Sequence, residues 1–136
     1  GHLALWLASA EQPPAGLAGV VALAPVASLA EAHRLHLSHD AAVELLGGTP
    51  DQEPAAWAAA DPARLGLTLP AVVLTGANDD EVPGSVVAAY QEGREVDEPV
   101  TFSEVVGAGH YDLIDPDHAA YLTLLAHLEQ LAIGLG

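Results

Sequence analysis

The sequence predicts an α/β fold, built on three parallel strands with flanking helices. Three apolar runs rich in β-branched residues lie near residues 19–24, 71–75 and 100–106, and segments with helical periodicity separate them. Runs that are apolar throughout are typical of strands buried on both faces. Strands that alternate with helices favour parallel pairing through right-handed crossovers. We therefore expect a single α/β domain over residues 1–136.

The first and last helices are indicated by apolar residues that recur with helical periodicity, at i, i+3, i+4, i+7 in the first and at i, i+4, i+7 in the last, where Leu125 widens the stripe. The first is predicted over residues 2–10, from the apolar residues Leu3, Trp6, Leu7 and Ala10. The last is predicted over residues 116–133, from the apolar residues Leu124, Leu125, Leu128 and Leu131. These stripes are the helix faces that we expect to be buried.

A helical insertion is predicted between the first two strands, covering about residues 27–63. Three short helices are expected within it, over residues 28–36, 40–47 and 54–60. Gly47 and Gly48 close the second of them as a C-terminal cap. A further helix over residues 83–92 follows the second strand, with proline in its first turn and Ser85 as a capping residue.

Composition excludes several classes of partner. Hydrophobic residues make up 51% of the chain and charged residues 16%, as in a folded domain. Acidic residues outnumber basic ones nineteen to three, for a formal net charge of −16. Nucleic acids and anionic membranes both require a basic surface, so neither is expected as a partner. The apolar amino-terminal segment lacks the basic flank of a signal peptide, so we expect a cytoplasmic protein.

An acid and a histidine each follow a predicted strand at its carboxyl end. Asp79 comes after the run 71–75, and His110 comes after the run 100–106. Open α/β sheets place their chemistry at this edge. A carboxylate that orients a histidine makes up two parts of a Ser-His-Asp relay. Asp79 and His110 are therefore our candidate catalytic residues, with Asp80 as the alternative acid.

The same residues also have a purely structural interpretation. Asp79 would then be one of several acids in the first turn of a helix, where the helix dipole favours negative charge. His110 would be a histidine of a surface loop. Gly107 and Gly109 favour the catalytic interpretation, because they permit a tight turn that projects His110 from the sheet.

Two motifs resemble the carboxy-terminal half of the α/β-hydrolase superfamily, of the esterase, lipase and dienelactone-hydrolase type. The acid loop of that family, Gly-x-x-Asp-x-x-Val-Pro, is matched by the residues Gly76, Asp79, Val82 and Pro83. Its histidine loop, Gly-x-Gly-His, is matched by the residues Gly107, Gly109 and His110. The resemblance implies a serine hydrolase with an ester or related acyl substrate and no cofactor. Asp79 and His110 would be the acid and the histidine of its catalytic triad.

The opening segment, Gly1 to Ala8, resembles the helix that follows the Gly-x-Ser-x-Gly-Gly nucleophile elbow of this family. Gly1 would be the last glycine of that elbow, with the serine just upstream. Within the 136 residues the motif is absent, and none of the five serines has its setting: Ser9, Ser28, Ser38, Ser85 and Ser103. We therefore expect the chain alone to be inactive, and the missing amino-terminal half of the fold to be its partner. The insertion 27–63 resembles the family's cap.

A second hypothesis is a catalytically dead α/β module that binds a protein partner. A three-stranded sheet leaves an apolar edge open, and such an edge favours association, including a homo-oligomer. The parent gene discriminates between the two hypotheses, because an encoded Gly-x-Ser-x-Gly ahead of Gly1 favours the hydrolase.

A third hypothesis is a metal-binding domain based on His33, His36 and His39. On a regular helix the third histidine drifts off the face shared by the first two, so a zinc site requires a bent helix. The same histidines fit a solvated helix face or the substrate entrance equally well.

We also have expectations for four other residues. Trp6 and Trp57 are expected to be packing residues, Tyr111 to lie at the pocket or in the core, and His118 to lie on the surface. The three acids expected at the start of the last helix are Asp112, Asp115 and Asp117.

Overall fold

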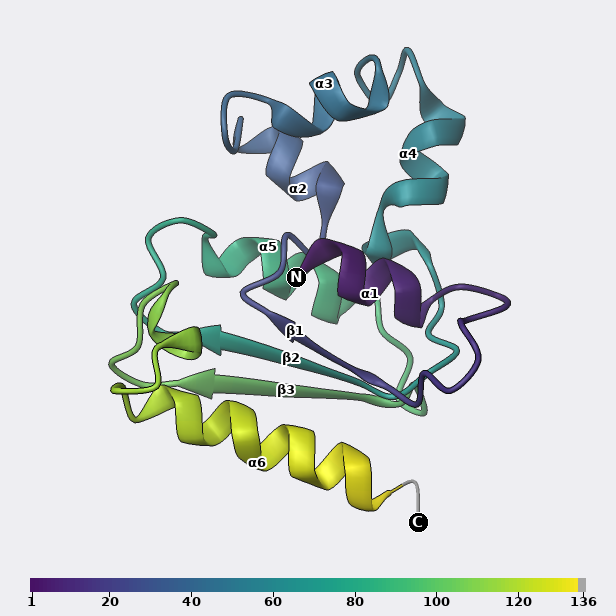
Figure 1. Cartoon of the computed structure of the whole chain (residues 1–136). Helices are drawn as coiled ribbons and strands as arrows, with labels where there is room; N and C mark the ends of the chain where they lie inside the picture. The colour runs from purple at the N-terminus through teal and green to yellow at the C-terminus, as the bar shows by residue number, and fades with distance from the viewer. Residues whose placement is uncertain (135–136) are drawn as a thin grey trace.

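A computed structural model describes residues 1–134 and confirms the predicted parallel sheet (Figure 1). Its strands are β1 (Val20–Leu23), β2 (Ala71–Gly76) and β3 (Val100–Val105), in the spatial order β1-β2-β3. In the parallel register Val21 lies opposite Val72, and Val73 lies opposite Phe102. The central strand β2 is almost completely buried, as its uninterrupted apolar run predicts.

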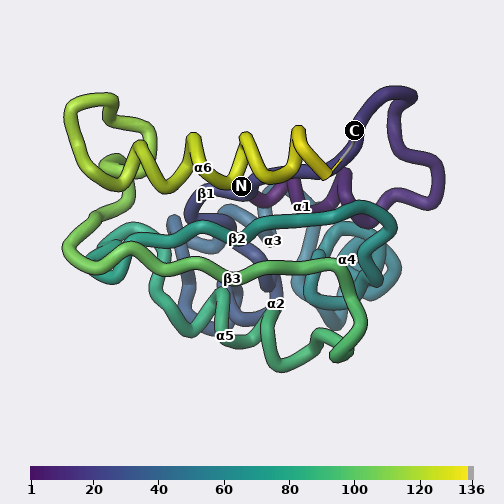
Figure 2. Tube along the Cα trace, turned by 90° about the horizontal axis from the view of Figure 1, so that it is seen from below, coloured from purple at the N-terminus to yellow at the C-terminus, as the bar shows by residue number. Residues whose placement is uncertain are grey.

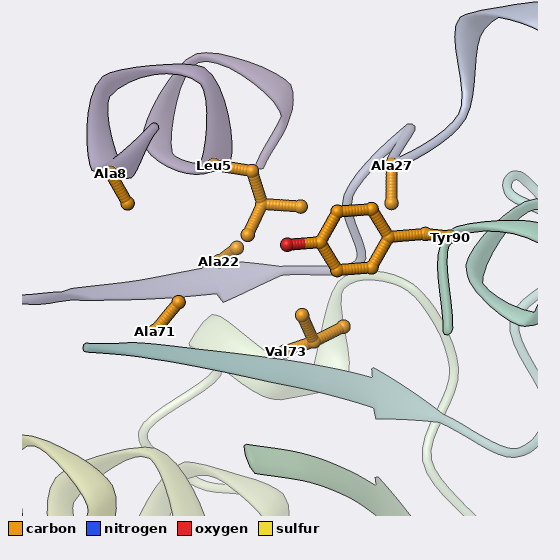
Figure 3. Packing of buried hydrophobic residues seen from close by; sticks show 7 residues of the cluster. All are labelled: Leu5, Ala8, Ala22, Ala27, Ala71, Val73 and Tyr90. Atoms are coloured by element: carbon orange, nitrogen blue, oxygen red, sulfur yellow. The ribbon is translucent and has the colours of Figure 1, made fainter. Parts of the chain in front are cut away.

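Helices cover both faces of the sheet (Figure 1). One face carries α1 (His2–Ala8) and α5 (Gly84–Glu92), and the other carries α6 (Ala120–Ile133). The α1–α5 side has a core of seven buried residues (Figure 3), namely Leu5, Ala8, Ala22, Ala27, Ala71, Val73 and Tyr90. A smaller core lies on the α6 side, centred on Leu74, Leu113 and Leu124. In the part of the chain that the structure describes, no helix combines the length and hydrophobicity needed to cross a bilayer.

The predicted insertion forms a helical layer above α1 and α5 (Figure 1). It contains α2 (Leu29–Arg34), α3 (Ala41–Leu46), α4 (Pro54–Ala60) and the 3₁₀ turn η1 (Pro62–Arg64). Gly47 ends α3 with a φ of 81°, the left-handed cap that its sequence predicts. Trp57 is 1% exposed and its Nε1 donates to the Gly48 carbonyl, which confirms its expected packing role.

The two ends of the insertion meet at Asp61, a carboxylate that is 1% exposed. It accepts hydrogen bonds from the backbone amides of Leu29 (2.9 Å) and Ala30 (3.1 Å) in the first turn of α2. It also accepts one from the amide of Ala63 (3.1 Å) in η1. Asp61 therefore satisfies amides at the start of α2 that have no partner within the helix.

The last helix begins four residues later than the sequence predicts. Asp115 Oδ1 accepts from the Asp117 amide at 3.0 Å, a side-chain turn that competes with helix formation. The helix begins at Ala120, whose amide donates to Nδ1 of His118 at 3.1 Å. Before this turn lies η2 (Asp112–Ile114), which the sequence pattern does not indicate.

The prediction of which face of α1 is buried is wrong. Leu3 and Trp6 are 72% and 43% exposed, whereas Leu5 and Ala8 are the buried pair that faces β1 (Figure 3). The Trp6 Nε1 donates to the carbonyl of Ala59, so this ring lies against the end of α4. Residues 9 and 10 are not helical.

The predicted stripe of α6 is also only partly buried. Leu124 is 9% exposed, but Leu125 and Leu128 are 43% and 46% exposed. Seen from below, α6 runs beside β1, at one side of the sheet (Figure 2). A helix in this position has sheet under only part of its apolar surface, which explains the exposed leucines.

Candidate active site

The loops that carry the predicted acid and histidine lie side by side at the carboxyl edge of the sheet. Asp79 follows β2 and His110 follows β3, and these two strands are parallel neighbours. Parallel neighbours bring their carboxyl ends to the same edge, so the topology itself places the two loops together.

His110 and Asp79 are in direct contact. The Nδ1 atom of His110 lies 2.8 Å from Oδ2 of Asp79, and the two side chains are 25% and 7% exposed. The other oxygen of Asp79 accepts the amides of Glu81 (2.9 Å) and Val82 (2.8 Å). With the carboxylate held on both oxygens, Nδ1 donates its proton to Asp79, and Nε2 is the nitrogen left to accept another.

Asp80, the alternative acid, is exposed and does not contact His110. Ser85 was expected to cap the next helix, but α5 begins at Gly84 and has no side-chain cap. The loop is held instead by Asp79 itself, whose Oδ1 accepts two successive backbone amides. One carboxylate therefore shapes the loop and also contacts the histidine.

Gly76 permits the close approach of the two loops. A Cβ atom at this position would lie 2.3 Å from the carbonyl oxygen of Ala108, closer than any real contact. That same carbonyl accepts the amide of Asn78 at 2.9 Å, which joins the loops through their backbones. Gly107 has a φ of 80°, as expected for a residue that makes the left-handed turn before His110.

Two further residues complete the histidine loop. The ring of Tyr111 lies edge-on to His110, with 4.9 Å between ring centroids, and is 66% exposed. Its place is therefore at the border of the site and not in the core. Asp112 accepts the amide of Gly109 at 2.7 Å, a contact that the sequence analysis missed. The available signal was an acid three residues after a glycine and at the start of a helical turn, as in a capping box.

A cavity of about 310 Å³ lies under the acid loop, between the sheet and α5. Val73, Val87 and Phe102 contribute apolar surface to it, and Asp79 and Glu104 contribute carboxylates. His110 does not line this cavity. The cavity therefore contacts the acid of the pair but not the histidine.

The histidines of the insertion do not form the three-histidine arrangement. The Nδ1 atoms of His33 and His36 each contact one oxygen of Asp40, at 3.1 and 2.8 Å, while His39 takes no part. Hydrogen bonding, chiefly from His36, lowers the pKa of Asp40 below its ordinary value. Within residues 1–134 no three potential ligand side chains converge as a metal ion requires.

The parallel sheet and its flanking helices match part of the α/β-hydrolase fold. Among solved structures, the chain is similar to an esterase from the planctomycete Thermogutta terrifontis with butyrate bound. The two are 19% identical with a TM-score of 0.67, and the match covers 99% of this chain and 53% of the esterase. The same esterase phosphoramylated by tabun matches with the same score over 51% of its length.

The chain is also similar to dipeptidyl peptidase 4 from Porphyromonas gingivalis. That match is 17% identical with a TM-score of 0.57, and covers 83% of this chain and 15% of the peptidase. In the comparison with the esterase structures, by contrast, the chain spans about half of their length. No protein-family model and no curated protein sequence matches it.

Proposed function

We propose that this chain supplies the histidine and the acid of a serine hydrolase that cleaves carboxylic esters or related acyl bonds. The observation that carries the proposal is the 2.8 Å contact between His110 Nδ1 and an Asp79 carboxylate that two backbone amides hold in place. Nε2 of His110 would take the proton of an attacking serine and return it to the leaving group. Asp79 would orient the ring and stabilise the imidazolium.

The nucleophile of this proposal is a serine on a segment that joins Gly1. Gly1 packs closely on the end of β1, where a Cβ atom would lie 2.6 Å from the carbonyl of Leu23. The next residue, Ala24, shares a buried cluster with Ala108, two residues before His110. A serine just ahead of Gly1 would therefore reach the same edge of the sheet as the histidine.

The rest of the hydrolase would dock along β1. This strand pairs only with β2 among the described residues, so its outer edge carries unpaired backbone groups. The helices α1 and α6 both contact β1, and each has exposed apolar side chains: Leu3 and Trp6 in α1, and Leu125 and Leu128 in α6. The chain alone, with no Gly-x-Ser-x-Gly motif, would be inactive.

The proposed substrates are esters of short-chain acids. The similar esterase has been solved with butyrate and with propionate bound, and these acids indicate the first substrates to assay. The helical insertion between β1 and β2 would cover the acyl site as a cap and influence this preference.

Activity of the complete protein on p-nitrophenyl butyrate tests the proposal. If the parent gene encodes Gly-x-Ser-x-Gly ahead of Gly1, a fluorophosphonate probe should label that serine. Asp79→Asn should lower kcat/KM by about 100-fold or more, because the histidine loses its orienting partner. Asp80→Asn is the matched control and should leave the rate unchanged. Full activity of a His110→Ala variant would refute the proposal.

The second candidate is a binding module without catalytic activity, and the exposed apolar surface beside β1 is the observation that favours it. A parent gene without the serine motif would support this candidate. Mass spectrometry of material captured by the chain, with Leu128→Glu as the non-binding control, would then identify the partner.

A further inference from the structure

We infer that Asp112 is a positioning residue for His110. Its Oδ2 atom accepts the amide of Gly109 at 2.7 Å, one residue before the histidine. A hydrogen bond to a charged acceptor is stronger than one between neutral groups, and this one fixes the Ala108–Gly109 peptide unit, just ahead of His110. The catalytic meaning of this role rests on the proposed function, but the geometry does not.

The loop needs such support because it contains two residues of high conformational freedom. Gly107 has a φ of 80°, and Gly109 also lacks a side chain that would limit its backbone. Asp112 is the acceptor that the structure provides for the amide of Gly109. Without it, this partly buried amide would lose its partner, and the backbone at Gly109 would be less restrained.

Asp112 also connects the loop to α6 through His118. The Nδ1 atom of His118 accepts the amide of Ala120, so the neutral ring carries its proton on Nε2. That Nε2 lies 3.8 Å from Oδ2 of Asp112, the same oxygen that holds Gly109. His118, at the start of α6, thus lies close to the carboxylate that holds the loop leading to His110, without a hydrogen bond to it.

NMR of the full chain tests this role independently of any hydrolysis. In the wild type, a scalar coupling across the hydrogen bond should connect the Gly109 amide with the side-chain carboxyl carbon of Asp112. Asp112→Ala should speed exchange of the Gly109 amide by about tenfold or more. It should also broaden the Nδ1–H resonance of His110, because the ring no longer holds one orientation against Asp79.

Asp112→Asn serves as the rescue variant, because its amide oxygen can still accept the Gly109 amide and should keep both signals close to wild type. Asp117→Ala removes a nearby exposed acid and should change neither signal. Unchanged Gly109 exchange and an unchanged His110 resonance in Asp112→Ala would overturn the inference. If that variant does not fold, absence of the coupling in the wild type would overturn it instead.

Kinetics of the complete hydrolase give the second readout. Asp112→Ala should lower kcat by about tenfold with little change in KM, since misorientation of the histidine affects the reaction more than binding. Should the proposed function fail, no variant will hydrolyse esters, yet the NMR signals will still report on the loop. The two failures are therefore distinguishable.

Discussion

At the scale of single residues, Tyr90 places an unpaired hydroxyl in the middle of the core. Its side chain is fully buried, next to Leu5 and Ala22 (Figure 3). Among the described residues, its hydroxyl oxygen has no hydrogen-bond partner. The ring lies edge-on to Phe102 at 6.0 Å and carries the Arg94 guanidinium over its face at 4.4 Å. The ring therefore packs well, while the hydroxyl adds a desolvation cost.

Tyr90→Phe should leave stability at neutral pH unchanged or increase it by about 1 kcal/mol, because it removes only the unpaired hydroxyl. Burial raises the pKa of Tyr90 above its ordinary value of 10.0. The folded state thus favours the neutral phenol. The contribution of Tyr90 to folding stability is therefore fully present below pH 10.0 and is lost as the pH rises through the higher pKa of the folded state. The Phe variant should lack this alkaline loss.

Urea unfolding at pH 7 and at about pH 11 measures both effects, with Tyr111→Phe as the exposed control. A clear destabilisation of Tyr90→Phe at pH 7 would show that the hydroxyl has a partner in solution.

At the scale of secondary-structure elements, Asp61 connects two segments that lie far apart in sequence. Its carboxylate accepts amides from the start of α2 and from η1, and so closes the base of the insertion. On its outer side, the end of α4 accepts hydrogen bonds from α1: Ala60 faces Nε2 of His2, and Ala59 accepts from Trp6. These hydrogen bonds anchor the insertion to α1, and α2 and η1 also pack against α5.

Asp61→Ala should lower the free energy of unfolding by about 2 kcal/mol, because one buried and two partly buried amides lose their acceptor. Asp61→Asn should cost less, since its amide oxygen still accepts. Urea denaturation followed by tryptophan fluorescence measures the loss, because Trp57 lies inside the insertion and Trp6 contacts it. Asp51→Ala, an exposed position of the insertion, is the control. Equal stability of Asp61→Ala and wild type would contradict this account.

The elements also show how far sequence reasoning extends. The three strands follow from uninterrupted apolar runs, and the meeting of Asp79 with His110 follows from two neighbouring parallel strands. The buried faces of α1 and α6 could not be predicted in this way, because they depend on where each helix lies relative to β1. The role of Asp61 could not be predicted for a similar reason. Before Pro62 it indicates only a helix end, and its partners in α2 lie 32 and 31 residues away in the sequence.

At the scale of the whole molecule, an apolar surface coexists with a high negative charge. Leu3 and Trp6 are exposed on α1, and Leu125 and Leu128 are exposed on α6. The net charge of −16 opposes association of like copies, and salt screens that repulsion. Charge and apolar surface therefore act in opposite directions.

We expect the isolated chain to self-associate, and to do so more strongly as salt rises from about 0.05 M to about 0.5 M, because screening weakens the repulsion. Combined Leu125→Glu and Leu128→Glu should return it to a monomer. Sedimentation velocity measures the effect, and Leu45→Glu, which changes an exposed leucine of the insertion, is the control. A monomer at every salt concentration would contradict the expectation.

The close approach at Gly76 has a consequence for how this sequence can diverge. Any side chain there would clash with the Ala108 carbonyl. A substitution in the acid loop at this position would therefore displace the histidine loop as well. In a library saturated at every codon, we expect position 76 to retain glycine alone. Exposed neighbours such as Ala77 should accept many residues. A single invariant glycine would then mark, in the sequence, the place where the two loops meet.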